Sequence, residues 1–350
     1  MEKGHFTHQE IISQPEAWAA ALEVLAEQRR SVMDIGLAGR YDQLIFTGCG
    51  STYYLSLAAA ALTQELTGRP SRAFPASELW LYPGNSYASG KTLLVAVSRS
   101  GETTETLRAC QAFLDGKRGD LLTLSCCGDM PLAKMGAFNI VLPSGQEQSV
   151  AQTRAFSTLY LGTVALACLW AGREDLFASL SKIPEAGTRL LKNYTSLAAG
   201  LGRDTSVDRF YWLGSGPRHG LACELSLKMK EMSLSHSEPF HFMEFRHGPK
   251  SMVTPSALTI GLRSTANGQM EAAVLDDVKA LGGRVLDIAE TGSEASPRGA
   301  DQGIWFESGL DEAVRNMLYL PIGQMIAFNR SLSKGLNPDR PLNLDAVVKL

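Results

Sequence analysis

Strand-like runs of Ile, Leu, Val and Phe alternate with longer segments of helical periodicity along the 350 residues. The clearest of these runs are YDQLIFTG (41–48), KTLLVAVS (91–98), DLLTLSCC (120–127) and FNIVLP (138–143). Because they are nearly continuous in apolar residues and do not alternate, they are typical of parallel strands with helices on both faces of the sheet. The sequence therefore predicts an α/β chain with doubly wound parallel sheets.

The second half of the chain repeats the first. YDQLIFTGCG (41–50) aligns with VDRFYWLGSG (207–216), and the segment that starts at Lys91 aligns with the one that starts at Ser256 at almost the same offset. Three matched pairs are each 166 residues apart: Asp42 and Asp208, Gly48 and Gly214, Gly50 and Gly216. A duplicated α/β unit accounts for this pattern.

Length and composition agree with two domains. A chain of 350 residues with 45% hydrophobic and 20% charged residues has the balance of a globular protein with large cores. We expect an N-terminal helical segment over residues 1–39, a first α/β domain over 40–197, a second over 198–335, and a C-terminal tail over 336–350 that folds over the site.

Several partner classes are disfavoured by charge and hydropathy. The net charge is −3 and the basic clusters, such as 29–30 and 117–118, are short, which argues against nucleic acid. The most apolar stretch, residues 158–172, is too short to span a bilayer, and the first residues contain no signal-like apolar run. The six cysteines have no CxxC spacing, which is typical of free thiols in a reducing compartment. We expect a cytoplasmic protein without a membrane partner.

The stretch SRSGETTET (98–106) directly follows the strand-like run KTLLVAV (91–97) and is almost free of apolar side chains. Ser98, Ser100 and Thr103 would lie with Gly101 at the start of a helix, where backbone N–H groups and the helix dipole favour an anion. Ordinary N-capping is the alternative, but it needs one hydroxyl and not three. The second copy has RSTANGQME here, so the turn itself does not require the hydroxyls. Arg99 would either contact the anion or point to solvent.

Two further polar loops open helices in the first copy. TGCGSTYY (47–54) contains Ser51 and Thr52, and SVAQTRAFST (149–158) contains Val150 and Gln152. Each loop alone is a weak signal. Loops that follow strands of one parallel sheet meet at the carboxyl ends of those strands, where open α/β sheets bind their ligands.

The second copy contains a charged pattern in CELSLKMKEMS (223–233). Glu224, Lys228 and Glu231 are four and three residues apart, which places them on one face of a helix. They form either a catalytic group or a stripe of surface ion pairs, and the spacing alone favours neither.

The histidines and glutamates of HSEPFHFMEFRH (236–247) suggest a metal site at first sight. The segment has no HExxH motif and no cysteine ligand nearby, so we expect no metal there.

Taken together, these motifs resemble the sugar isomerase (SIS) family. The similarity is strongest to the tandem isomerase half of glucosamine-6-phosphate synthase and to stand-alone amino-sugar phosphate isomerases, deaminases and fructosamine-6-phosphate deglycases. It extends over nearly the whole chain and is found in EIISQP, CGSTYY, SRSGETTET, EQSVAQTRAF, CELSLKMKEMS, EFRHGP and NPDRPLNL. The fold it implies is two tandem doubly wound SIS domains.

The resemblance also implies roles for particular residues. Glu231 would be the base that moves a proton between C1 and C2, and Lys228 would assist it. His247 would come from the neighbouring subunit of a homodimer and help ring opening. The substrate-binding residues would be Ser51, Thr52, Ser98, Arg99, Ser100, Thr103, Val150, Gln152 and Glu224. No cofactor is implied. An anchored phosphate, a carboxylate base and a proton shuttle are the groups that aldose–ketose interconversion needs.

Three departures from the synthase pattern refine this expectation. The chain starts MEKGHF, without a cysteine nucleophile at position 1 or 2, so we do not expect glutamine-dependent amination by this chain alone. Asp345 and Ala346 follow Asn343 and Leu344 where the family has a lysine, and Lys349 comes three residues too late. Arg99 and Gln152 replace Gln and Ser, which suggests a different sugar or an anion such as a sulfonate.

We therefore expect an isomerase or deaminase of a ketose or amino-sugar 6-phosphate. The alternatives are a fructosamine-6-phosphate deglycase, a sugar-phosphate-binding regulator without activity, and a purely structural α/β protein.

Overall fold

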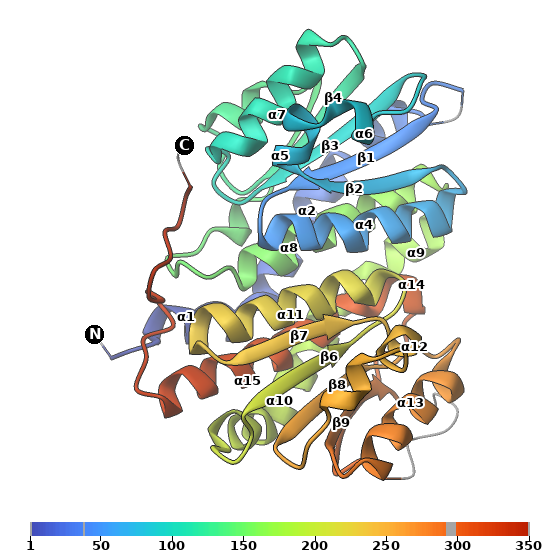
Figure 1. Ribbon diagram of the computed structural model, residues 1–350. Coiled ribbons are helices and arrows are strands. Elements are labelled where there is room, and N and C mark those ends of the chain that lie inside the picture. The colour runs from blue at the N-terminus through green and yellow to red at the C-terminus, as the bar shows by residue number, and fades with distance from the viewer. Residues whose placement is uncertain (1, 38, 292–298, 349–350) are drawn as a thin grey trace. The chain divides into compact units, whose positions relative to one another are not determined.

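The computed structural model describes residues 2–37, 39–291 and 299–348 (Figure 1). It contains two compact units. The first unit consists of residues 13–148, 152–184 and 345–350, and the second consists of residues 1–12, 149–151 and 185–344.

The first unit is built on a parallel sheet of five strands in the order β2-β1-β3-β4-β5. The strands are β1 (Gln43–Gly48), β2 (Ser71–Pro75), β3 (Thr92–Ser98), β4 (Gly119–Ser125) and β5 (Phe138–Val141). Every residue of β1 and β3 is buried, which is why the centres of these strands, residues 44–46 and 93–97, are unbroken apolar runs in the sequence. They pair in register, with Phe46 opposite Val95.

The second unit repeats this sheet in the order β10-β9-β8-β6-β7. Its strands are β6 (Arg209–Leu213), β7 (His236–Phe240), β8 (Ala257–Leu262), β9 (Arg284–Glu290) and β10 (Gln302–Phe306). Numbered from the first strand of each copy, the order of the strands is the same in the two sheets. The predicted duplication of a parallel α/β unit is therefore confirmed.

Helices cover both faces of each sheet (Figure 1). In the first unit they are α2 (Gln14–Glu27), α3 (Arg29–Asp34), α4 (Ser51–Thr67), α5 (Ala76–Leu81), α6 (Pro83–Ser86), α7 (Thr104–Asp115), α8 (Arg154–Trp170) and α9 (Glu174–Ser179). In the second they are α1 (His5–Ile12), α11 (Pro217–Ser233), α12 (Phe242–Phe245), α13 (Gly268–Ala280), α14 (Glu312–Arg315) and α15 (Leu320–Ser333), with most of α10 (Ile183–Arg203).

The apolar stretch at 158–172 forms the larger part of α8. This helix packs against α4 and is buried from Ala155 to Leu169, so it is a core helix of the first unit. No described helix has the length and hydropathy needed to cross a membrane.

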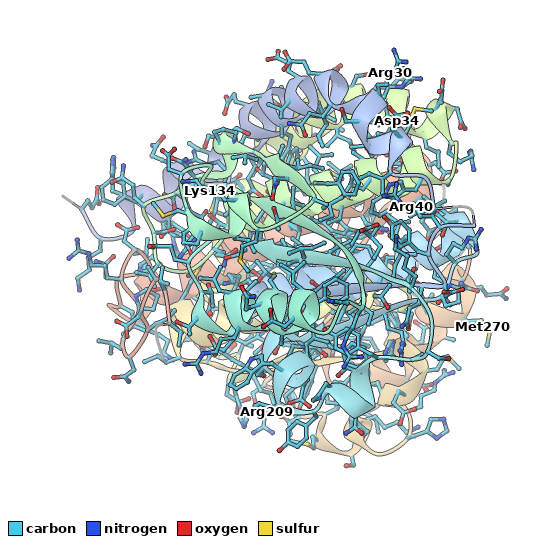
Figure 2. All side chains as sticks on the ribbon, turned by 90° about the horizontal axis from the view of Figure 1, so that it is seen from above. Arg30, Asp34, Arg40, Lys134, Arg209 and Met270 are labelled. Atoms are coloured by element: carbon cyan, nitrogen blue, oxygen red, sulfur yellow. The ribbon has the colours of Figure 1, made fainter. Side chains whose placement is uncertain are left out.

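The short basic cluster at 29–30 lies on the surface of the first unit. Arg29 pairs with Glu174 at 2.6 Å, and Arg30 projects outward (Figure 2). This cluster therefore forms part of a mixed-charge surface.

The glycines that are repeated in the two copies have the same structural role in each copy. A Cβ on Gly48 would lie 2.4 Å from Thr52 Oγ1, and a Cβ on Gly214 would lie 2.4 Å from the carbonyl oxygen of Arg218. Each glycine thus lets the end of a strand approach the first turn of the next helix. Gly50 and Gly216 then cap α4 and α11 with φ of 55° and 57°.

Replacing Gly48 by Ala is expected to destabilise the first unit by about 1–3 kcal/mol, because the added methyl group overlaps the first turn of α4. Urea unfolding followed by circular dichroism measures this loss. Gly84→Ala is the matched control, since a Cβ there meets no atom within 4 Å. Equal unfolding midpoints for the two variants would contradict this packing argument.

Candidate active site

The anion loop, residues 98–103, connects β3 to α7 in the first unit. Ser98 Oγ accepts a hydrogen bond from Gly101 N at 3.1 Å, and Ser100 Oγ accepts one from Glu102 N at 3.2 Å. Gly101 has φ of 72°, which favours glycine. Because both hydroxyls accept these bonds, their protons can be donated to a ligand. The two serines therefore shape the loop and can still serve an anion.

Thr103 is the N-cap residue of α7, yet its side chain makes no capping hydrogen bond. The sequence left N-capping open as the alternative role of this hydroxyl, and the geometry gives Thr103 no such role. Thr104 N, at the first residue of the helix, donates to Val348 O at 3.4 Å. Within the first unit, the end of the tail thus lies against the anion loop.

Arg99 makes a buried ion pair. Its Nη1 lies 3.2 Å from Glu147 Oε1, and the side chains are 11% and 0% exposed. Glu147 also accepts hydrogen bonds from Thr153 N and Ala155 N at the start of α8. Glu147 neutralises Arg99, so Arg99 adds no net positive charge at the anion loop. The charge of Arg99 therefore gives no reason to expect a sulfonate.

The start of α4 contains the other predicted anion ligands. Ser51 and Thr52 are both buried. Thr52 Oγ1 donates to Cys49 O at 3.0 Å and accepts from Cys49 N at 2.9 Å. This hydroxyl holds the turn between β1 and α4.

Gln152 carries an unsatisfied acceptor. Its Oε1 atom is buried and has no hydrogen-bond partner among the residues that the structure describes. A buried carbonyl oxygen without a donor costs about 1–3 kcal/mol, so such an atom is a candidate for a ligand contact.

The charged pattern of the second copy is buried and is not a surface stripe. On α11, Lys228 Nζ lies 3.3 Å from Glu224 Oε1 and is also hydrogen-bonded to Glu231 Oε2. The side chains of Glu224 and Lys228 are fully buried, and that of Glu231 is 16% exposed. Burial opposes the charge of Lys228, but the two carboxylates outweigh it and raise the pKa of this ammonium. Lys228 is therefore a protonated partner of both glutamates.

Glu231 is the member of this triad that borders a cavity. The cavity has a volume of about 310 Å³ and lies within the second unit. Its other lining residues come from the N-terminus, the end of α11 and the tail, among them Lys3, Leu234, Asn337 and Arg340. A carboxylate held by a buried ammonium at the wall of a cavity can accept a proton from a bound molecule.

Val150 and His247 also belong to the second unit. Val150 N donates to Asp339 O at 3.0 Å. His247 follows α12, is exposed, and has no hydrogen bond or ion pair to the triad among the described residues. The triad is thus the one group of predicted catalytic residues that the second unit assembles.

One of the histidines considered as metal ligands, His241, stacks on another histidine ring. The ring of His241 stacks on that of His219, with centroids 3.6 Å apart. Burial and the neighbouring His241 lower the pKa of His219 to about 4. Within the described ranges, no group of three or more His, Cys, Asp or Glu side chains could hold a metal ion.

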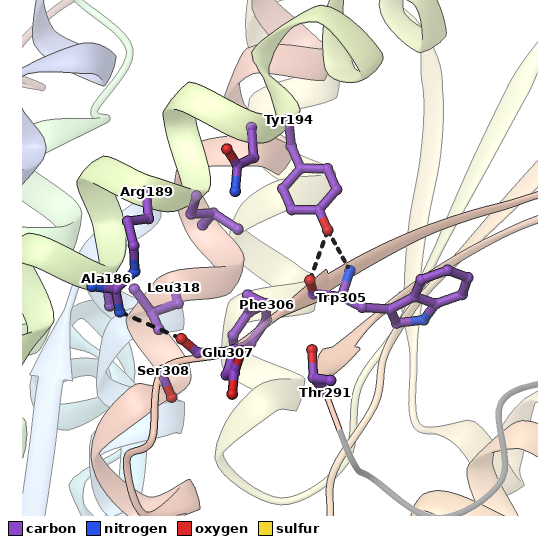
Figure 3. Close-up of a pocket in the computed structure, with 11 residues that line it drawn as sticks. Ala186, Arg189, Tyr194, Thr291, Trp305, Phe306, Glu307, Ser308 and Leu318 are labelled. Atoms are coloured by element: carbon purple, nitrogen blue, oxygen red, sulfur yellow. Dashed lines mark hydrogen bonds between the residues drawn. The ribbon is translucent and has the colours of Figure 1, made fainter.

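A second pocket of about 240 Å³ lies between α10 and β10 in the second unit (Figure 3). Tyr194 Oη donates to Trp305 O at 2.7 Å and accepts from Trp305 N at 3.2 Å at this pocket. No predicted site residue lines it.

One segment of the chain matches a known family. Residues 40–169, which contain the anion loop, match the SIS domain family. This segment is a SIS domain. The resemblance inferred from the motifs is thereby confirmed.

Curated relatives match nearly the whole length of this chain. A glutamine–fructose-6-phosphate aminotransferase (isomerizing) of Methanothermobacter thermautotrophicus is 26% identical over 99% of this chain and 58% of its own. The chain thus spans less than three fifths of that relative.

Solved structures show the same fold over both units. Tagatose-6-phosphate ketose/aldose isomerase from Escherichia coli has a TM-score of 0.87 at 22% identity and covers 96% of this chain and 95% of its own. Glucosamine-6-phosphate deaminase from Thermotoga maritima has a TM-score of 0.74 at 24% identity and covers 95% of this chain and 100% of its own.

Sequence reasoning missed several buried partners of the predicted residues. In the first unit it did not find Glu147, although an acidic residue seven positions before α8 is a weak signal for a helix cap. In the second unit it missed Asp339, which accepts hydrogen bonds from Thr7 N and Oγ1 at 2.8 Å, and Glu10, which accepts one from Ser149 N at 3.2 Å. No local motif signals these long-range contacts.

Proposed function

We propose that this chain is a phosphosugar isomerase or deaminase that moves a proton between C1 and C2 of a ketose or amino-sugar 6-phosphate. The observation that carries this proposal is the Glu224–Lys228–Glu231 triad, in which a buried ammonium holds a carboxylate at a cavity wall. The names of the aminotransferase, isomerase and deaminase relatives support the same chemistry.

In this mechanism the anion loop pins the phosphate. Ser98 and Ser100 donate their hydroxyl protons, and the side chain of Thr103 is not engaged in a helix cap. A fixed phosphate restricts the orientation of the open-chain sugar, which favours reaction at its far end. Gln152 supports sugar binding, because its buried Oε1 atom can accept a hydrogen bond from a sugar hydroxyl.

Glu231 then takes the proton from one of the two reacting carbons and returns it to the other. The Lys228 ammonium orients the Glu231 carboxylate through a charge-assisted hydrogen bond. His247 moves protons between the sugar oxygens. Glu224 shares Lys228 from the opposite side, at 3.3 Å, and keeps the ammonium in place.

A thermal-shift screen tests the binding half of this proposal. Fructose 6-phosphate, glucosamine 6-phosphate, galactosamine 6-phosphate, a fructosamine 6-phosphate and a sulfonated hexose are compared on the wild type and on Ser100→Ala. We expect one phosphosugar to stabilise the wild type and to bind Ser100→Ala about tenfold more weakly, because a donor to a charged oxygen is lost. Ser181→Ala, an exposed serine of the same unit, is the control. If the wild type, Ser100→Ala and Ser181→Ala bind the phosphosugar with equal affinity, the anion loop does not bind the phosphate.

Arg99→Gln is expected to change phosphosugar affinity by less than about threefold, because Glu147 already neutralises Arg99. The same variant should lower the unfolding midpoint in urea, since it leaves the buried Glu147 without its cation. Titration calorimetry and urea unfolding measure the two effects. A tenfold loss of affinity at unchanged stability would mean that Arg99 contacts the ligand.

We also propose a cytoplasmic homodimer in which His247 completes the site of the neighbouring subunit. Mixing His247→Ala with Glu231→Gln, each inactive alone, should restore about a quarter of the wild-type activity, since mixed dimers contain one intact site. Analytical ultracentrifugation of the wild type measures its molar mass in solution and shows whether it is a dimer. Absence of recovery from mixtures that demonstrably exchange subunits would place both residues in one chain's site.

A regulator that binds a sugar phosphate without turnover is the second candidate. It is favoured by Asp345 and Ala346, which stand where the family pattern has a lysine. Lys349, the one residue that could replace that lysine, lies outside the described residues. Binding of a phosphosugar by the wild type with no turnover of any screened compound would support the regulator.

A further inference from the structure

The turn that corresponds to the anion loop in the second unit surrounds a carboxylate of the protein itself. This turn connects β8 to α13. Thr265 N and Ala266 N donate to the same atom, Glu312 Oε2, at 2.9 and 3.1 Å. Consecutive backbone N–H groups that converge on one oxygen before a helix are the arrangement by which loops bind phosphate.

Two buried arginines complete the surroundings of this carboxylate. Arg218, from the first turn of α11, is hydrogen-bonded to Glu312 Oε1, and Arg315 Nη2 lies 3.8 Å from Glu312 Oε2. Both side chains are 5% exposed, and the Nε atom of each has no hydrogen-bond partner within the described part of the chain. The arginines therefore retain donors that the carboxylate does not use.

Two other carboxylates lie near the arginines, but neither is hydrogen-bonded to them. Arg218 Nη2 lies 3.8 Å from Glu271 Oε1, and Arg315 Nε lies 3.7 Å from Glu290 Oε2. Burial raises the pKa of Glu271, whereas the pKa of Glu312 is lowered on balance: burial opposes its charge, but Arg218 and the two N–H groups outweigh it. Glu312 is thus the anion that this cluster stabilises.

The duplication relates this cluster to the anion loop. Ser264 Oγ accepts from Asn267 N at 2.9 Å, as Ser98 Oγ accepts from Gly101 N at 3.1 Å, and the two serines are 166 residues apart. At the same offset Arg218 corresponds to Thr52.

The backbone donors correspond as well. When β3 and β8 are aligned by their pairing with β1 and β6, the offset is 165, and the N–H groups of Thr265 and Ala266 are the counterparts of those of Ser100 and Gly101. The second unit has therefore kept the frame of an anion site and has added two arginines to it.

We propose that this cluster is a second oxyanion site, that Glu312 is its built-in ligand, and that it accepts a phosphate-sized oxyanion once the Glu312 side chain is removed. In the wild type the carboxylate fills the site, so the second unit binds no phosphate at this turn. The ligand class is a tetrahedral oxyanion, either inorganic phosphate or the phosphate of a sugar.

Glu312→Ala tests the proposal with inorganic phosphate as the probe. The variant should melt below the wild type, because two buried arginines lose one of their neighbouring carboxylates, the one that is hydrogen-bonded to Arg218. Phosphate at about 50 mM should raise its melting temperature by about 4–8 °C more than that of the wild type, if it binds with a dissociation constant near 1 mM. Chloride at equal ionic strength is the salt control, and Glu307→Ala is the control for loss of an exposed glutamate.

Two further arms separate this site from the anion loop of the first unit. The double variant Glu312→Ala with Arg218→Met keeps that loop intact and should lose the extra response to phosphate. Fructose 6-phosphate in place of phosphate shows whether a sugar-linked phosphate fits the vacated site. A response of Glu312→Ala no larger than that of the wild type overturns the proposal, whatever the anion loop does.

If Glu312→Ala does not fold on expression, its refolding from urea replaces the melting experiment. The proposal expects folded protein in about 50 mM phosphate or sulfate and little in chloride of equal ionic strength. Equal recovery in all three salts overturns it.

Discussion

Glu231→Gln is expected to lower the turnover of the phosphosugar substrate about a thousandfold, because the amide cannot accept a proton from carbon. The substrate should still bind, since the anion loop is unchanged and the amide has nearly the shape of the carboxylate. The turnover number is measured on the phosphosugar identified by the thermal-shift screen, and the dissociation constant is measured by calorimetry.

Glu238→Gln is the matched control for this substitution. Glu238 is a partly exposed glutamate on β7 of the same unit, and its replacement should leave turnover within about twofold of the wild type. Turnover of Glu231→Gln equal to that of Glu238→Gln would exclude Glu231 as the base.

Lys228→Met is expected to destabilise the protein by about 3–5 kcal/mol, the range found when one partner of a buried ion pair is removed. Methionine roughly fills the volume of the aliphatic chain, so most of this loss comes from Glu224, whose side chain is fully buried beside the missing ammonium. Urea unfolding followed by circular dichroism measures the change.

A second substitution tests this explanation of the loss. Lys228→Met combined with Glu224→Gln removes the buried negative charge as well and should regain part of the stability. The free energies of unfolding of the two single variants and the double variant are compared. If the losses caused by Lys228→Met and Glu224→Gln simply add in the double variant, the two charges do not depend on each other.

The fold could be predicted because the strands of these sheets are covered on both faces. β3 is buried at every residue, and its residues 93–97 form an unbroken apolar run that can be recognised without knowledge of its neighbours. The repeat at an offset of 166 residues then fixed the number of sheets. Periodicity is a local property, and the fold class follows from it.

The triad shows where local reasoning ends. Helical spacing predicts that Glu224, Lys228 and Glu231 share a face of α11. The spacing does not say whether that face is buried, because the helix that packs against α11, α15, is distant in the sequence. Only the structure distinguishes a surface stripe from a buried group.

The partners of the arginines could not be predicted at all. Arg99 and Glu147 are 48 residues apart, and Arg218 and Glu312 are 94 apart. No spacing rule links such pairs, and each changes what the sequence suggested. Arg99 brings no net charge to the anion loop, and the loss of hydroxyls in the second copy is matched by an internal carboxylate.

Hydrogen exchange at the sugar carbons tests the central claim most directly. The wild type is incubated in D₂O with each phosphosugar that it binds, and proton NMR follows the signals at C1 and C2. We expect deuterium to enter one of these positions with the wild type and not with Glu231→Gln. A phosphosugar that binds the wild type tightly while deuterium enters neither carbon, for every compound that binds, would contradict this claim.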